Sequence, residues 1–351
     1  MGYLRGMSLI SDLSYRAGAT AKLAFYGAHY GLSRVMSAPF VRPSDMPFAS
    51  DKPLPDRKML SGAFMSAFTQ DRENIASGLY LAPDPRSQIR QTTKSLAYLR
   101  DVRAIDARRL ADKGTEVRQD PASEGFPAYF RQNFHWQSGG WLTDKSADLY
   151  DFQVETIFTG SAGAMRRATA LALLADSLKG QDQRTLQCAE IACGTGQFAG
   201  EIMRNFPRLN LTAFDMSPAY AAKAARALKV FASAKVVTGA AEAMPFEDAS
   251  LDRAVCIYLF HELPPKIRKA VASEAARVIK KGGVLILADA LQEGDDVNLD
   301  RMLEAFPIGF HEPFFASWLK TDTIKLFEAA GFKLADTRQA FLTKAWAFER
   351  V

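Results

Sequence analysis

The sequence predicts an α/β fold: a doubly wound, mostly parallel sheet with helices on both faces, preceded by a helical N-terminal cap. Residues 185–192 form a short apolar run, which a glycine turn joins to a helical pattern over residues 197–206. A second apolar run follows at residues 209–214, and apolar runs that alternate with helical patterns are typical of parallel strands joined by crossover helices. We assign residues 1–150 to the cap and residues 151–351 to the sheet domain.

The glycine turn predicts a nucleotide site. Gly194 and Gly196 let the backbone turn tightly and let a ligand approach the amides at the start of the helix. Asp215 lies nineteen residues after Gly196, at the end of the second apolar run, where a carboxylate can accept both hydroxyls of a ribose. Because Gly194, Gly196 and Ala199 also satisfy the G-x-G-x-x-A dinucleotide fingerprint, the glycines alone leave an NAD(P)-dependent oxidoreductase open.

The residues around this turn and downstream of it, roughly 185–351, resemble the class I S-adenosylmethionine-dependent methyltransferases. The stretch Glu190–Gly196, reading E-I-A-C-G-T-G, is similar to motif I of that family, in which an acidic residue at the place of Glu190 holds the amino group of the methionine moiety. Four later segments are similar to family segments in the same order: G-A-A-E-A-M-P-F at 239–246, Y-L-F-H-E-L-P at 258–264, the helix, turn and fifth strand at 277–286, and the A-G-F turn with a closing hairpin strand at 329–350. The pattern is most similar to the ubiquinone and menaquinone C-methyltransferase-like enzymes of the type 11 group.

This resemblance implies a seven-stranded Rossmann-like methyltransferase sheet with S-adenosyl-L-methionine as cofactor. Ala240 stands where the family often has Asp, so adenine recognition there would depend on backbone groups and Glu242. We call residues 239–246 the adenine segment. The implied cofactor-binding residues come from the glycine turn, the end of the second strand, the adenine segment and the end of the fourth strand: Glu190, Ala192, Cys193, Gly194, Thr195, Gly196, Gln197, Asp215, Met216, Ser217, Ala241, Glu242, Ala243 and Tyr258.

Methyl transfer is an in-line displacement, so the protein mainly positions the acceptor, and a base is needed only where the acceptor must lose a proton. His261 and Glu262 follow the fourth apolar strand, and His311 lies in the insertion after the fifth strand; we treat these three as candidate catalytic residues because ligands bind at strand ends in open α/β sheets. No H-E-x-x-H or other zinc-ligand spacing occurs, so the sequence predicts no metal. Motif IV lacks the Asn/Asp-Pro-Pro-aromatic pattern of nucleic-acid amino methyltransferases, so we expect no nucleic-acid substrate.

Aromatic residues gather in two places that could contact the acceptor. The first is residues 129–142, which we interpret either as a lid over the site or as an ordinary hydrophobic anchor of the cap. The second is the insertion after the fifth strand, which could equally be a core under a long loop. This aromatic density favours a lipophilic acceptor such as a quinone, fatty-acyl, polyketide or sterol-like molecule. The candidate substrate and lid residues are Tyr129, His135, Trp136, Trp141, Phe310 and Glu312.

The cap begins with a segment, residues 8–37, in which Asp12 is the only acid among basic and aromatic side chains. It contains no span of 18 uncharged apolar residues, so we expect it not to cross a membrane. It could lie on a membrane surface, pack on the catalytic domain or a partner protein, or act as a targeting segment. We expect a proline-rich linker at residues 39–55 and helices at 87–113 and 150–178.

Composition is typical of a soluble enzyme of the cytoplasm, free or peripherally bound to a membrane. The net charge of +5 lies entirely in residues 1–150, with 20 basic against 15 acidic residues, whereas residues 151–351 carry 24 of each; this is too little for a dedicated nucleic-acid binder. Cys188, Cys193 and Cys256 show no C-x-x-C spacing and are interpreted as reduced core residues. The resulting hypothesis is methyl transfer to carbon or oxygen of a lipophilic small molecule. A cofactor-binding protein that serves as a non-catalytic scaffold stays open beside the oxidoreductase, as does the oligomeric state.

Overall fold

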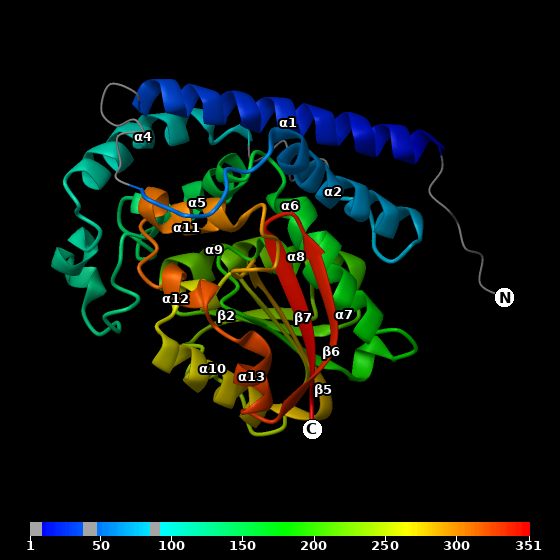
Figure 1. Ribbon diagram of the computed structural model, residues 1–351. Coiled ribbons are helices and arrows are strands. Elements are labelled where there is room, and N and C mark those ends of the chain that lie inside the picture. The colour runs from blue at the N-terminus through cyan, green and yellow to red at the C-terminus, as the bar shows by residue number, and fades with distance from the viewer. Residues whose placement is uncertain (1–8, 38–47, 85–91) are drawn as a thin grey trace.

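The structure, a computed structural model, describes residues 9–37, 48–84 and 92–351 (Figure 1). Three parts of the sequence predictions lie outside these residues: Ser8 of the first segment, residues 39–47 of the linker, and residues 87–91 of the second helix.

Within the described chain, seven strands form one sheet in the order β3-β2-β1-β4-β5-β7-β6. Strands β1 to β5 run parallel to one another, whereas β7 is antiparallel to both β5 and β6. The predicted doubly wound, seven-stranded sheet with a helical N-terminal region is therefore confirmed. The strands are β1 (Gln187–Ile191), β2 (Asn210–Asp215), β3 (Ala234–Thr238), β4 (Leu251–Ile257), β5 (Ile279–Ala290), β6 (Phe332–Ala340) and β7 (Thr343–Arg350).

Helices cover both faces of this sheet, because each apolar strand buries side chains on two sides. One hydrophobic core joins β1 and β2 to α7 (Ala172–Ser177) and α8 (Gln197–Asn205), while a second core on the other face joins β4 and β5 to α10 (Pro265–Val278) and α13 (Thr323–Glu328). The remaining elements of the sheet domain are α6 (Ala162–Arg166), the π-helical turn η5 (Arg167–Leu171), α9 (Pro218–Leu228), α11 (Asp300–Phe310) and α12 (Phe315–Leu319).

The cap consists mainly of α1 (Leu9–Ser37), α2 (Arg57–Ala76), α4 (Ser95–Leu110) and α5 (Asp144–Ile157). Figure 1 shows α1 as one long helix along an edge of the molecule, and it contacts α2, α4 and α5. Lys22 forms a buried ion pair with Glu155 at 2.8 Å, and Tyr26 packs against Phe152, so the inner face of α1 rests on the protein itself. The predicted domain boundary between residues 150 and 151 falls inside α5.

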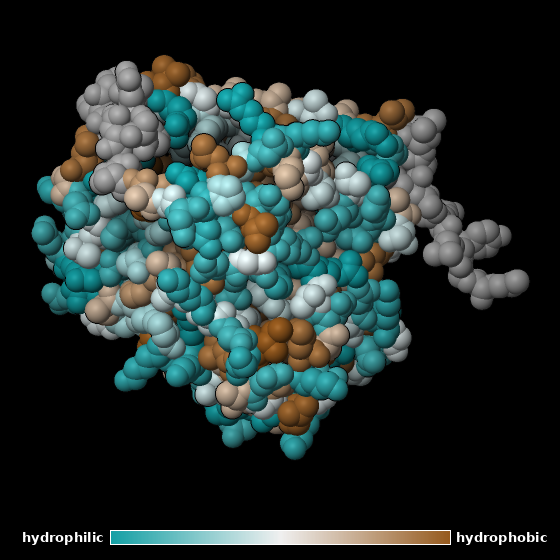
Figure 2. All heavy atoms as spheres, in the orientation of Figure 1, coloured by the Kyte–Doolittle hydropathy of each residue, from teal (hydrophilic) through white to brown (hydrophobic). Residues whose placement is uncertain are grey.

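The outer face of α1 exposes Leu13, Leu32 and Val35. Figure 2 shows that, on the face in view, apolar side chains are interspersed with many hydrophilic ones. Among the described helices, none combines the length and the apolar character needed to cross a bilayer.

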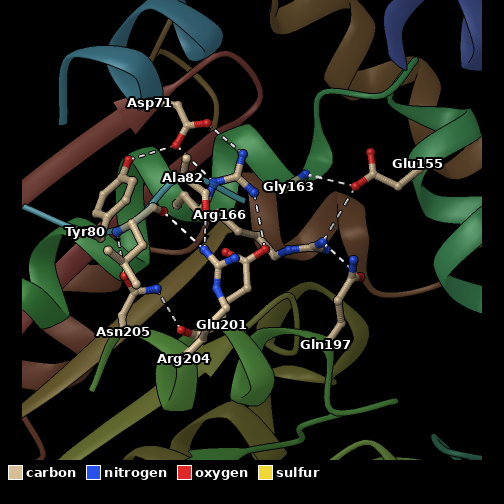
Figure 3. A network of polar contacts seen from close by, with 12 residues as sticks. Asp71, Tyr80, Ala82, Glu155, Gly163, Arg166, Gln197, Glu201, Arg204 and Asn205 are labelled. Carbon is tan, nitrogen blue, oxygen red and sulfur yellow. Dashed lines mark hydrogen bonds and ion pairs between the residues drawn. The ribbon is translucent and has the colours of Figure 1, made fainter. Parts of the chain in front are cut away.

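A buried charge network fastens α2 to the sheet domain (Figure 3). Arg167 donates two hydrogen bonds to Asp71, at 3.0 and 2.6 Å, and one to Glu201 of α8, at 3.2 Å. Asp71 also accepts hydrogen bonds from the hydroxyls of Tyr15 and Tyr80, at 2.6 and 3.0 Å. Four hydrogen bonds thus satisfy one fully buried carboxylate, whose charge Arg167 balances, and the bonds from Arg167 hold α2 beside η5.

Candidate functional site

A cleft beside the carboxyl ends of β1, β2 and β4 is the site that the glycine turn predicts, and we name it the nucleotide cleft. It encloses about 750 Å³ of empty space. Its floor is formed by residues that follow the strands, and its roof is formed by aromatic side chains from the cap and α9. The lining residues are Tyr129, Phe130, Phe134, Trp141, Tyr150, Ala192, Gly194, Phe214, Asp215, Met216, Tyr220, Gly239, Ala241, Glu242, Ile257, Tyr258, Leu259, Glu262 and Leu263.

The two glycines of the turn have different roles. Gly194 has φ +54°, and a Cβ there would meet no atom within 4 Å, so this position leaves open space at the cleft. Gly196 has φ +76°, and a Cβ there would lie 2.9 Å from the Cα of Ala224. Gly196 therefore allows α8 to approach α9 closely, whereas Gly194 allows a ligand to approach the backbone.

Asp215 faces the cleft from the end of β2. Its two carboxylate oxygens accept hydrogen bonds from the backbone N–H groups of Gly194, at 2.9 Å, and Ser217, at 2.8 Å. Burial raises the pKa of Asp215 to about 6, and the two amides oppose that rise. The side chain is therefore largely a carboxylate at neutral pH, held in place and able to accept bonds from ribose hydroxyls.

Glu190 is buried at the end of β1 and does not line the cleft. Burial raises its pKa to about 8; the positive charge of Arg166 opposes this rise and the charge of Asp215 adds to it. Its Oε2 atom is buried and has no hydrogen-bond partner within the described chain. An unsatisfied acidic oxygen beside the turn fits a ligand that carries a positive charge, such as the ammonium group of a methionine moiety.

The adenine segment and the aromatic roof meet at Glu242. Its Oε1 atom accepts a short hydrogen bond from the hydroxyl of Tyr129, and its Oε2 atom is buried without a partner in the described chain. Ala241 lines the cleft beside it, whereas Ala243 is exposed and lies outside the lining. Residues 129–142 thus form a roof over the nucleotide cleft, with Trp141 stacked on Phe134 at 5.5 Å.

Several residues predicted to bind the cofactor make hydrogen bonds that support the turn. Thr195 donates a 2.6 Å hydrogen bond to Asp151, and Gln197 accepts a 3.1 Å bond from Arg166. Ser217 caps the N-terminus of α9, and its hydroxyl donates to the carbonyl of Trp141. Cys193, like Thr195, Gln197 and Ser217, is absent from the lining of the nucleotide cleft.

A second cavity, which we name the apolar pocket, adjoins the nucleotide cleft and shares Tyr150, Tyr258 and Glu262 with it. It encloses about 680 Å³ of empty space. Its walls are mainly aliphatic and aromatic, and its polar groups are His135, Tyr150, Tyr258, His261 and Glu262. The lining residues are His135, Tyr150, Val154, Phe158, Tyr258, His261, Glu262, Ala290, Met302, Leu303, Phe306, Phe315 and Leu342.

His261 lies in a 3₁₀ turn, η7 (Phe260–Glu262), directly after β4. Its Nδ1 atom is 2.6 Å from Oδ1 of Asp289, a fully buried carboxylate at the end of β5. Burial lowers the pKa of His261, but the charge of Asp289 raises it by more, so that the net pKa is about 9. Sequence reasoning missed Asp289; an acid near the carboxyl end of the strand beside β4 was the signal that could have revealed it.

Glu262 and Glu312 meet His261 although they come from different parts of the chain. Ligand atoms of these three residues lie within 4.8 Å of one another. Nε2 of His135 is 3.1 Å from Oε1 of Glu312, close enough for an ion pair but not aligned for a hydrogen bond. Burial and then the charge of Glu312 raise the pKa of Glu262 well above its usual range.

His311, predicted as a candidate catalytic residue, lines neither cavity. Its ring lies tilted against that of Trp136, with the centroids 4.7 Å apart, and its Nε2 atom lies 3.2 Å from Oε1 of Gln132. Its φ of +42° at the end of α11 turns the chain, so that Glu312 points inward while His311 does not. Trp136 is likewise outside both linings. Phe310 is outside them too, but its ring contacts two residues that line the apolar pocket, Phe306 at 4.7 Å and His135 at 6.3 Å.

Residues 189–283 match a family model described as "Methyltransferase domain". This span contains the glycine turn, Asp215, the adenine segment, and both His261 and Glu262. No curated protein sequence matches the chain.

Solved structures of methyltransferases show a partial similarity to the chain. An S-adenosylmethionine-dependent methyltransferase from Aquifex aeolicus is 15% identical with a TM-score of 0.41, over 53% of this chain and 93% of that one. One from Methanosarcina mazei is 19% identical with a TM-score of 0.40, over 48% and 94%. A geranyl diphosphate methyltransferase, solved with GPP and sinefungin, is 12% identical with a TM-score of 0.39, over 50% and 76%.

Proposed function

We propose that this chain, which carries a class I S-adenosylmethionine-dependent methyltransferase domain, transfers the methyl group of S-adenosylmethionine to an oxygen or carbon atom of a lipophilic small molecule. The observation that carries the proposal is the apolar pocket, which opens against the nucleotide cleft through the shared residues Tyr150, Tyr258 and Glu262. Two adjoining cavities of different character match the two substrates of a transfer reaction.

The nucleotide cleft offers a group for each part of the cofactor. Asp215 would accept the ribose hydroxyls, while Ala241 and Glu242 would contact the adenine. Glu190 would balance the ammonium charge through its unsatisfied oxygen, directly or through a water. When bound, S-adenosylmethionine supplies an electrophilic methyl group on a positively charged sulfur, and the aromatic roof, including Tyr150 and Trp141, presents ring faces that attract a cation and exclude water.

The side chains that line the apolar pocket indicate the chemical character of the acceptor. Its walls include Val154, Met302 and Phe306, which favour a hydrocarbon or aromatic body. The hydroxyl of Tyr258 is already hydrogen-bonded to Thr343, at 2.5 Å, so the imidazoles and Glu262 are the groups left to orient a polar end. A hydrophobic molecule with a hydroxyl or enol group fits this arrangement, and quinols of the kind methylated by type 11 enzymes are one such class.

The reaction asks little of the protein beyond position. The acceptor atom forms a bond to the methyl carbon while the carbon–sulfur bond breaks, and the electron pair of that bond stays on sulfur, which becomes neutral. If the acceptor is a hydroxyl, its proton passes to Glu262, which borders both cavities. The pocket walls would hold the acceptor atom roughly 3–3.5 Å from the methyl carbon.

The oxidoreductase alternative does not fit these observations. The family match covers the nucleotide-binding part of the chain, and β7 lies antiparallel between β5 and β6, where the dinucleotide-binding order 3-2-1-4-5-6 has no such strand.

Label transfer into lipophilic acceptors tests the proposal. The full chain is incubated with methyl-labelled S-adenosylmethionine and with quinols, sterols, phenolic polyketides, fatty acids and a cellular lipid extract, and label in the organic phase is counted. Met302→Trp should fill the apolar pocket and abolish transfer while leaving the affinity for S-adenosylhomocysteine unchanged. Met65→Trp, at a side chain that is 46% exposed on α2, is the matched control. Label found only in water-soluble acceptors, or full activity in Met302→Trp, would contradict the proposal.

A further inference from the structure

We propose that His261, Glu262 and Glu312 bind a divalent transition-metal cation where the apolar pocket meets the nucleotide cleft. The sequence predicted no metal, because that prediction considered ligand spacing along the chain, and Glu312 lies fifty residues from Glu262. In space, the ligand atoms of the three side chains lie within 4.8 Å of one another. Metal–ligand bonds of about 2.0–2.2 Å place donors roughly 3–4 Å apart, so modest rotations of the two carboxylates would complete the site.

Glu312 supplies an independent sign that a positive charge belongs here. Its side chain is 2% exposed, and neither carboxylate oxygen has a hydrogen-bond partner in the described chain. The imidazole of His135 has its Nε2 atom 3.1 Å from Oε1 of Glu312 but misaligned for a hydrogen bond, and the Nδ1 atom of that ring is also unpartnered in the described chain. A buried carboxylate is energetically costly unless it is paired or coordinates a metal. Because Glu312 lies beside His261 and Glu262 and accepts no hydrogen bond in the described chain, this cost favours its role as a metal ligand.

Asp289 prepares His261 to act as a ligand. It holds Nδ1 of the ring at 2.6 Å and accepts backbone hydrogen bonds from Phe260, His261 and Ala290. With Nδ1 engaged, Nε2 is the nitrogen left for a cation. A carboxylate that fixes the ring from behind is the arrangement that most metal-binding histidines show.

The donor set narrows the kind of cation. Two carboxylates and an imidazole, with His135 adjacent as a second imidazole, suit Zn²⁺, Mn²⁺ or Fe²⁺ better than Ca²⁺ or Mg²⁺, which prefer all-oxygen sites.

The place of the cluster indicates what the cation would do, and this step rests on the proposed function. Glu262 borders both cavities, so a cation beside it can hold an acceptor oxygen at the boundary with the nucleotide cleft. Binding to the cation weakens the O–H bond of a hydroxyl acceptor, whose proton passes to the oxygen of Glu262 that does not bind the cation. The acceptor oxygen then forms its bond to the methyl carbon, and the pair from the broken carbon–sulfur bond remains on sulfur.

Metal binding can be tested without any acceptor. The full chain is treated with a chelator, dialysed, and titrated with Zn²⁺ by calorimetry and with Co²⁺ by visible absorption, whose bands report the coordination. We expect one cation per chain. Glu312→Gln and His261→Gln should weaken binding about 100-fold or more. Glu328→Gln, an exposed glutamate on α13, is the matched control and should bind as the unaltered chain does.

Two further measurements keep the outcomes distinct. Affinity for S-adenosylhomocysteine, measured on the same samples, shows that each variant is folded and tests the cofactor site separately. The unfolding temperature of metal-free Glu312→Gln should exceed that of the metal-free chain, because the substitution removes an unpartnered buried charge. Absence of binding, binding that survives Glu312→Gln, or a lower unfolding temperature in that variant would each overturn the proposal and leave Glu312 as a structural partner of His135.

Discussion

The pH dependence of cofactor binding should reveal the carboxylate of Asp215. Since burial raises its pKa to about 6, this side chain is mostly ionised at pH 8 but only about one-tenth ionised at pH 5. Because the cofactor hydroxyls donate to the carboxylate, binding favours the ionised form of Asp215, and the affinity weakens as the pH falls through 6. Protonation alone should raise the dissociation constant of S-adenosylhomocysteine about tenfold between pH 8 and pH 5.

The substitution Asp215→Asn isolates this effect. At pH 8 the variant should bind about 10–100-fold more weakly, because two hydrogen bonds to a charged acceptor become bonds to a neutral amide. The Asn amide also meets the N–H groups of Gly194 and Ser217 less well, but that cost does not vary with pH. The ratio of the two dissociation constants, variant over unaltered chain, should therefore fall about tenfold from pH 8 to pH 5.

Calorimetric titrations at pH 5, 6, 7 and 8 measure this ratio. Titrating groups that Asp215 does not influence contribute to both proteins and cancel when the ratio is taken. Because the charge of Asp215 raises the pKa of Glu190, both proteins are also compared in the Glu190→Gln background. A ratio that stays constant across the range would refute the reasoning, because it would mean that the ionisation of Asp215 has no part in binding.

Four other substitutions test three separate parts of the structure. Asp71→Ala should lower the free energy of unfolding by about 3–5 kcal/mol in denaturant titrations, because it leaves buried Arg167 without its main partner, and a loss below about 1 kcal/mol would refute that role. Glu190→Gln should raise the unfolding temperature of the cofactor-free chain at pH 8 but not at pH 4. The pKa of Glu190 is about 8 in the native state and about 4.5 in the unfolded state, so between these two pH values the native state binds more protons. The native state therefore loses stability as the pH rises from 4.5 to 8, and Gln removes that loss. Gly196→Ala should destabilise the fold by about 1–3 kcal/mol, since its Cβ would collide with Ala224, whereas Gly194→Ala should mainly weaken S-adenosylhomocysteine binding; equal stability losses would contradict the separate roles of the two glycines.

Short-range sequence patterns predicted the sheet well because each strand has its own run of apolar residues. The apolar runs became β1, which is two residues shorter at its start and one at its end, and β2, which is shifted by one residue. The fourth strand ends at Ile257, directly before the 258–264 segment, because Tyr258 adopts φ +54° and the chain enters a 3₁₀ turn. The fifth strand begins at Ile279 and continues to Ala290, beyond the predicted residue 286. Such ends are decided by neighbouring strands, which a linear pattern does not contain.

The candidate site was harder to predict, because it also depends on contacts between residues that lie far apart in the sequence. Gly194 and Asp215 could be identified because both lie beside strand ends that the chain itself reveals. The pairing of Asp289 with His261, and the approach of Glu312, depend on how β5 and the residues after α11 fold back on β4. His311 and Glu312 are neighbours in sequence, yet a single positive φ sends one side chain outward and the other into the cluster.

Binding of the cofactor product tests the central claim most directly. Purified full-length chain is titrated by calorimetry at pH 7.5, in separate experiments, with S-adenosylhomocysteine and with NADH, and Asp215→Ala serves as the control. We predict micromolar binding of S-adenosylhomocysteine that the substitution abolishes, and no heat from NADH. Binding of NADH alone would contradict the assignment of the nucleotide cleft to S-adenosylmethionine and, with it, the methyl transfer.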